Sequence, residues 1–194
     1  MLIKEILSSV AIALTFYAFF PYIRSILKGE IKPHVFSWVI WGTTTLIVFF
    51  AQLAGGAGVG AWPIGISSLI TIYVAFLAYL KRGDIKITST DWFFFISAMS
   101  SLPFWYLTAD PFWAVVILTS VDIFGLGPTV RKAYAKPHEE SVSFFALIVV
   151  RNGLAIMALE LYSVTTVLFP AAVMVFCLLL VAVIVVRRKA LINS

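Results

Sequence analysis

The stretch PYIRSILKGEIKPHVFSWVIW, residues 21–41, decides the fold, because much of it recurs in residues 128–145, PTVRKAYAKPHEESVSFF. The triplet Lys-Pro-His at 32–34 returns at 136–138, which is 104 residues later. A repeat of this length indicates one structural unit used twice. The matches at a spacing of 107 residues include Pro21 with Pro128, Arg24 with Arg131 and Pro63 with Pro170.

The composition is that of a membrane protein. The 194 residues are 62% hydrophobic and 12% charged, with a mean hydropathy of +1.05. Soluble domains are about half apolar and a quarter charged, so we expect the chain to lie in a lipid bilayer. The net charge of +5 is gathered in short clusters between apolar runs, which indicates membrane topology and no nucleic-acid partner.

Seven apolar runs are long enough to be transmembrane helices. We expect an all-α integral membrane protein with spans at 6–24, 35–54, 61–80, 91–108, 111–130, 142–161 and 165–186.

The basic residues support this count. With seven spans, the segments after spans one, three, five and seven hold twelve Lys and Arg, whereas the opposite side holds only Lys4. Positive charge collects on the cytoplasmic side. We therefore expect the N-terminus outside and the C-terminus in the cytoplasm, most simply in a plasma (inner) membrane.

The repeat then divides the chain into three parts. We expect a first three-helix bundle at 1–88, a linker helix at 89–109 and a second bundle at 110–194. The linker gives both bundles the same orientation, so an axis along the membrane normal relates them. Pro21 and Pro128 lie near equivalent span ends and are candidate hinges. Pro63 and Pro170 are expected to open spans three and seven.

This arrangement resembles that of the SWEET and SemiSWEET transporters and the wider PQ-loop superfamily. The resemblance is carried by Pro21 and Pro128, by the basic loops after them and by Phe36-Ser37 at the start of span two. It implies a solute transporter that works by alternating access, or a receptor on the same fold.

The chain departs from that pattern at the glutamine of the PQ motif, where Tyr22 and Thr129 stand. Spans three and seven also lack the asparagines that grip sugar in SWEET proteins, so we expect a small polar or amphipathic solute. Ser37-Trp38 and Trp41 are similar to tryptophan-rich motifs of Pnu-type vitamin transporters, and a vitamin precursor is an alternative substrate.

Two charged residues within the apolar runs are the first candidates for function. Asp122 and Arg151 stand where the first unit has Thr15 and Thr44. We infer that they form an ion pair between spans five and six. The pair would tie the second bundle together, or else Arg151 would hold an anionic substrate and Asp122 would carry a proton.

Other polar and aromatic side chains are candidates for a central substrate path. Trp38 and Trp41 lie three residues apart on one helix face, where they stack on a ligand or anchor the helix. Gln52 and Glu160 either gate the outer side or are solvated there, and glycines 55, 56, 58 and 60 are expected to make that loop flexible. The predicted substrate-binding residues are Trp38, Trp41, Thr44, Thr45, Ser67, Thr71 and Asn152.

Catalysis and cofactors are not expected. The single cysteine, Cys177, has no evident catalytic partner, and His34 and His138 are too few to hold a metal ion. The sequence therefore predicts no enzyme, no metal and no cofactor, and its partners are a small-molecule substrate and the lipid bilayer. The oligomeric state stays open, a homo-oligomer included.

Overall fold

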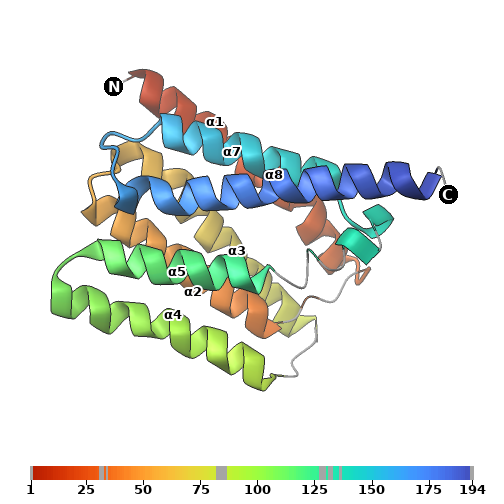
Figure 1. Ribbon diagram of the computed structural model, residues 1–194, viewed down its shortest axis with the longest axis horizontal. Coiled ribbons are helices and arrows are strands. Elements are labelled where there is room, and N and C mark those ends of the chain that lie inside the picture. The colour runs from red at the N-terminus through yellow and green to blue at the C-terminus, as the bar shows by residue number, and fades with distance from the viewer. Residues whose placement is uncertain are drawn as a thin grey trace.

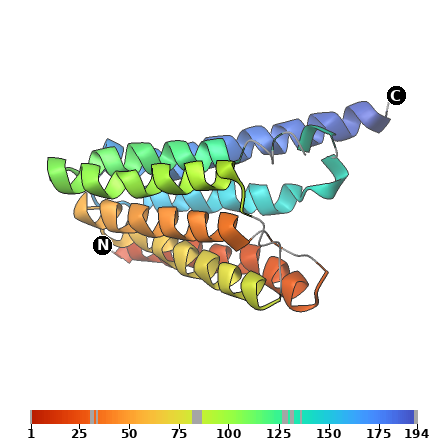
Figure 2. The same ribbon diagram turned by 90° about the horizontal axis from the view of Figure 1, so that it is seen from below.

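The computed structural model describes residues 2–30, 33, 35–81, 87–126, 130, 133–135 and 137–192. Long helices run side by side along the molecule (Figures 1 and 2), and the described ranges contain no β-strand. The long helices are α1 (Leu2–Leu27), α2 (Val35–Ala54), α3 (Trp62–Leu80), α4 (Ser89–Thr108), α5 (Pro111–Gly125), α7 (Val142–Met157) and α8 (Val164–Ile192). Two short 3-10 helices, η1 (Gly58–Ala61) and η2 (Pro137–Glu139), lie in connections.

Each of the seven predicted spans overlaps one of these helices, although α5 ends at Gly125 and α7 at Met157, short of the predicted ends at 130 and 161. Four helical stretches are long and apolar enough to cross a membrane, namely Leu2–Leu27, Val35–Ala54, Gly58–Leu80 and Val164–Leu191. Helices α5 and α7 are apolar but shorter, with 15 and 16 residues. The chain is thus an all-α integral membrane protein.

The outer surface of the bundle is also apolar. Large side chains such as Tyr17, Phe93, Tyr106 and Leu107 are between 66% and 86% exposed. Soluble monomers rarely show wide continuous apolar surfaces, whereas lipid tails solvate such side chains favourably. The exposed aromatic and aliphatic residues are those expected of a lipid-facing surface.

The helices pack in the same order twice. Helix α3 packs against both α1 and α2, and α8 packs against both α5 and α7. We call α1, α2, η1 and α3 the first set, and α5, α7 and α8 the second set. The sets meet through α1 against α7 and α2 against α5, while α4 lies at the edge of the bundle beside α5 and α2 (Figure 1).

Side-chain caps define where α5 and α7 begin. Asp110 accepts a hydrogen bond from the Phe112 amide (2.9 Å) at the start of α5. Ser141 accepts one from the Phe144 amide (3.2 Å) at the start of α7. Such caps satisfy backbone donors that have no partner within the helix.

The prediction that Pro170 opens the seventh span is wrong. Helix α8 begins at Val164 and Pro170 lies inside it. Ser163 and Thr166 start the helix earlier, because the Ser163 amide donates to Thr166 Oγ1 (3.0 Å) and the Thr166 amide donates to Ser163 Oγ (3.3 Å). Pro63, in contrast, lies in the first turn of α3 as predicted.

Of the two candidate hinge prolines, only Pro21 lies within the described residues. Pro21 lies inside α1, and the helix continues past it to Leu27. Pro128 lies outside the described residues, and the hinge roles of both stay predictions.

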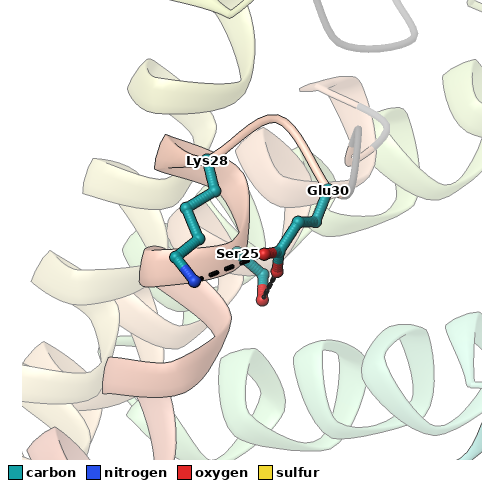
Figure 3. Close-up of polar contacts among 3 residues, drawn as sticks. All are labelled: Ser25, Lys28 and Glu30. Atoms are coloured by element: carbon teal, nitrogen blue, oxygen red, sulfur yellow. Dashed lines mark hydrogen bonds and ion pairs between the residues drawn. The ribbon is translucent and has the colours of Figure 1, made fainter.

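A turn of charged and polar residues follows α1 (Figure 3). Ser25 Oγ donates to Glu30 Oε2 (2.8 Å) and Lys28 Nζ lies 3.4 Å from Glu30 Oε1. Gly29 between them has φ +76°, a conformation that glycine adopts at little cost. The hydrogen bond from Ser25 and the charges of Lys28 and Arg24 lower the pKa of the Glu30 carboxyl below its ordinary value.

Candidate functional site

The two predicted tryptophans lie on α2 in an aromatic cluster. The ring of Trp38 is 5.1 Å from that of Tyr22, 6.4 Å from that of Phe19 and 5.6 Å from that of Trp41. Tyr22 and Phe19 belong to α1, so Trp38 packs within the first set. Trp41 faces the second set, since a β-carbon at Gly125 of α5 would lie 3.4 Å from its indole nitrogen.

The threonines after Trp41 mainly bond to their own helix. Thr44 Oγ1 and Thr45 Oγ1 lie 3.0 Å and 2.6 Å from the Trp41 carbonyl oxygen, to which they donate. Such bonds satisfy a buried hydroxyl without a ligand. Thr44 also reaches the second set, because its Oγ1 lies 3.4 Å from Asp122 Oδ1 on α5, so its one proton is shared between this carboxylate and the Trp41 carbonyl.

Two polar side chains of α3 bond to the backbone of their own helix. Thr71 Oγ1 donates to the Ser67 carbonyl (2.8 Å), and Ser68 Oγ donates to the Gly65 carbonyl (2.7 Å). All three side chains are buried. The bonds of Ser68 and Thr71 to the helix backbone are those of a structural role. The substrate-binding role predicted for Ser67 and Thr71 stays a prediction.

Arg151 and Asn152 form a second polar group, on α7. Arg151 is 4% exposed and Asn152 is fully buried. Arg151 Nη2 donates to Asn152 Oδ1 (3.0 Å), and Arg151 Nη1 donates to the Pro63 carbonyl of the first set (3.4 Å). Asn152 Nδ2 donates to the Ile148 carbonyl (2.9 Å), which holds the amide oxygen toward the guanidinium.

Asp122 and Arg151, both described, do not form the inferred ion pair. Asp122 bonds to Thr44 of α2, and Arg151 bonds to Asn152 and Pro63. The physical reason is the packing order, because α8 lies between α5 and α7. Cys177 of α8 is buried in the core that α8 shares with these helices.

A feature that sequence reasoning missed joins the two sets at the end of the bundle where the N-terminus lies (Figure 1). The Glu160 amide donates to the Ala57 carbonyl (3.0 Å), and the Leu161 amide donates to the Gly56 carbonyl (3.2 Å). We call the contact between residues 55–61 and 158–161 the interloop seam.

Glycines allow the two segments of the interloop seam to pack closely against each other. A β-carbon at Gly60 would lie 2.7 Å from the backbone of Leu159, and one at Gly58 would collide with the Glu160 carboxylate. Gly58 also has φ +57°. The loop predicted to be flexible on account of its glycines is instead tightly packed, because the missing side chains allow two backbones to approach.

Four side-chain bonds reinforce this end of the bundle. They run from Lys4 Nζ to the Leu159 carbonyl (2.7 Å), from Ser8 Oγ to the Val59 carbonyl (2.7 Å), from the Val59 amide to Glu160 Oε1 (3.2 Å) and from Gln52 Nε2 to the Thr166 carbonyl (2.6 Å). Gln52 and Glu160, suggested by the sequence as a gate, thus each bond to the neighbouring segment. The signal available in the sequence was the run of glycines, whose partner segment lies about 100 residues away.

The next feature is the placement of side chains that could bind a metal ion. Among the described residues no three His, Cys, Asp or Glu side chains lie close enough to hold a metal ion. His138 is exposed in η2, and His34 lies outside the described residues.

The chain matches no protein-family model, and neither the curated proteins nor the solved structures include a significant match. The functional argument therefore depends on the residues themselves.

Proposed function

We propose that the protein is a membrane transporter that moves a small polar or amphipathic solute between the two helix sets. Spans one to three and five to seven would be two parallel bundles, with α4 as the linker. Transport would proceed by alternating access, in which one set rocks against the other.

The observation that carries the proposal is the position of two charged residues within the apolar helices, of which Arg151 is buried and Asp122 is partly buried. Asp122 and Arg151 both bond from the second set to the first, through Thr44 and the Pro63 carbonyl. Intramembrane charges are costly and mark pathways for substrates or ions. A purely structural contact between two helix sets in lipid is made at lower cost by small and apolar residues.

The packing order of the helices also supports the proposal of a transporter. The third helix of each set packs between the other two, and the sets meet through equivalent pairs of neighbours. The interloop seam closes one end of their interface with backbone hydrogen bonds. In an alternating-access cycle this end opens when the two sets separate.

A reversible lock of the interloop seam tests the proposal. Val59→Cys and Glu160→Cys would be combined in a Cys177→Ala background and joined by a short bis-methanethiosulfonate linker. Proteoliposomes would be loaded with sugars, vitamin precursors, amino acids and carboxylates, and solute release would be followed by mass spectrometry. We expect one solute class to leave, the linked protein to stop its release, and a reductant to restore it.

The single-cysteine variants treated with the same reagent are the matched controls. Release that continues at the same rate in the linked protein contradicts an opening at the seam. A folded protein that binds a solute of the panel but releases none favours a receptor over a transporter.

A further inference from the structure

The guanidinium of Arg151 is buried with part of its hydrogen-bonding capacity unused. Of its five N–H groups, one bonds to the Asn152 amide oxygen and one reaches the Pro63 carbonyl at 3.4 Å. The Nε atom is buried and has no partner. Both acceptors are neutral, and no described carboxylate lies within 4 Å of the side chain.

A buried charge without a counter-charge is unfavourable. Removing a cation from water costs on the order of several kcal/mol, and neutral acceptors offset only part of that cost. The remedy seen in proteins is an anion that binds the guanidinium through charge-assisted hydrogen bonds. The two described carboxylates at contacts between the helix sets have other partners, because Asp122 accepts from Thr44 and Glu160 accepts from the Val59 amide.

The charge of the site limits the ligand. Arg151 is the only buried Lys or Arg in the described part of the chain. One cation balances one negative charge, so a monocarboxylate fits better than a phosphate dianion. Two residues along α7, Met174 of α8 lies 3.7 Å from the position of a β-carbon at Gly153, so this part of α7 packs against an apolar side chain.

We propose that Arg151, with Asn152 holding its guanidinium, binds the carboxylate of a monoanionic organic solute at the interface between the two helix sets. This inference rests on the proposed function, because it names the class of solute that the transporter carries. The interloop seam follows directly after α7, at the end of the bundle where the N-terminus lies.

The test uses the full chain in detergent, in a buffer free of carboxylates. Acetate, lactate and benzoate would each be compared with the matched amide and with sodium chloride by thermal unfolding. We expect at least one acid to raise the Tm by roughly 5–10 °C at a hundredfold excess over its Kd. The amides and chloride leave it unchanged.

Two variants then assign the effect to the site. Arg151→Gln removes the cation and should abolish the protection by the acid. Asn152→Asp places a carboxylate beside Arg151 Nη2, so it should raise the Tm without ligand and also abolish the protection. Lys189→Gln is the control, because it removes an exposed cation at the end of α8. This variant should keep the protection by the acid. The Asn152→Asp variant and the amide comparison remain informative even where Arg151→Gln fails to fold.

The proposal is overturned if none of the three acids protects the wild-type protein, if the amide or chloride protects equally, or if Asn152→Asp retains the protection. Flux of the labelled acid from proteoliposomes separates this inference from the proposed function. Protection without flux supports the anion site and contradicts a transporter. Flux of neutral solutes that needs no Arg151 charge supports a transporter and overturns the anion site.

Discussion

The carboxylate of Glu160 accepts a hydrogen bond from the Val59 amide at 3.2 Å and fills the space that a β-carbon at Gly58 would take. These residues are about 100 positions apart and belong to the two halves of the repeat. Their contact lies at the interloop seam, so the fit of one side chain against one glycine helps to hold that end of the bundle closed.

Gly58→Ala should destabilise this end of the protein. Alanine pays about 1–2 kcal/mol for the left-handed backbone conformation, and the collision with Glu160 adds to it. Gly29→Ala is the matched control, because Gly29 has φ +76° and open space around it. We expect a lower Tm for Gly58→Ala than for Gly29→Ala, and Glu160→Ala should recover part of the difference. Equal losses at both glycines contradict the tight contact.

Asp122 should couple to Thr44 and not to Arg151. The hydroxyl of Thr44 donates to Asp122 at 3.4 Å, whereas Arg151 has other partners. Asp122→Asn combined with Arg151→Gln should change the free energy of unfolding by the sum of the single changes, within about 0.5 kcal/mol. Asp122→Asn combined with Thr44→Val should depart from additivity. Coupling between Asp122 and Arg151 of more than about 1 kcal/mol would restore the ion pair inferred from sequence.

Thr166→Val should destabilise the start of α8. Thr166 is fully buried, its Oγ1 donates to the Leu161 carbonyl (2.8 Å), and it accepts from the Ser163 amide (3.0 Å). Loss of such a cap costs about 0.5–2 kcal/mol. Thr165→Val is the control, because Thr165 is also buried but makes no such capping bond. Chemical unfolding in detergent would compare the two, and equal stability of both variants contradicts the capping role.

Glu30 should titrate below the ordinary range of a glutamate. The hydrogen bond from Ser25 is the largest cause of its lowered pKa, followed by the charge of Lys28. A pKa that is lower in the folded state contributes stability above the unfolded pKa, and this contribution is lost as the pH falls through the folded pKa.

Carbon-detected NMR of labelled glutamate in micelles would follow the Glu30 titration. Ser25→Ala should raise the pKa of Glu30 more than Lys28→Gln does. The reverse order would show that charge, not the hydroxyl, controls the turn.

Part of the candidate site was open to prediction from the sequence. Asp122, Arg151 and Asn152 stand out because polar groups in apolar runs are costly, and the structure confirms that Arg151 and Asn152 are buried. Their partners were not predictable. The repeat aligns Asp122 and Arg151 with two threonines, but it does not show that α8 separates their helices.

The sequence by itself determined that the chain is an all-α membrane protein and where its helices lie. In lipid each helix must satisfy its own backbone hydrogen bonds, so a long apolar run is enough to define one. Only the tertiary structure decided which residues meet. The close approach at Gly58 and Gly60, the bond from Thr44 to Asp122 and the unpaired Nε of Arg151 depend on how helices far apart in the chain pack against each other. Local sequence does not encode that packing, because it depends on the shapes of both partners.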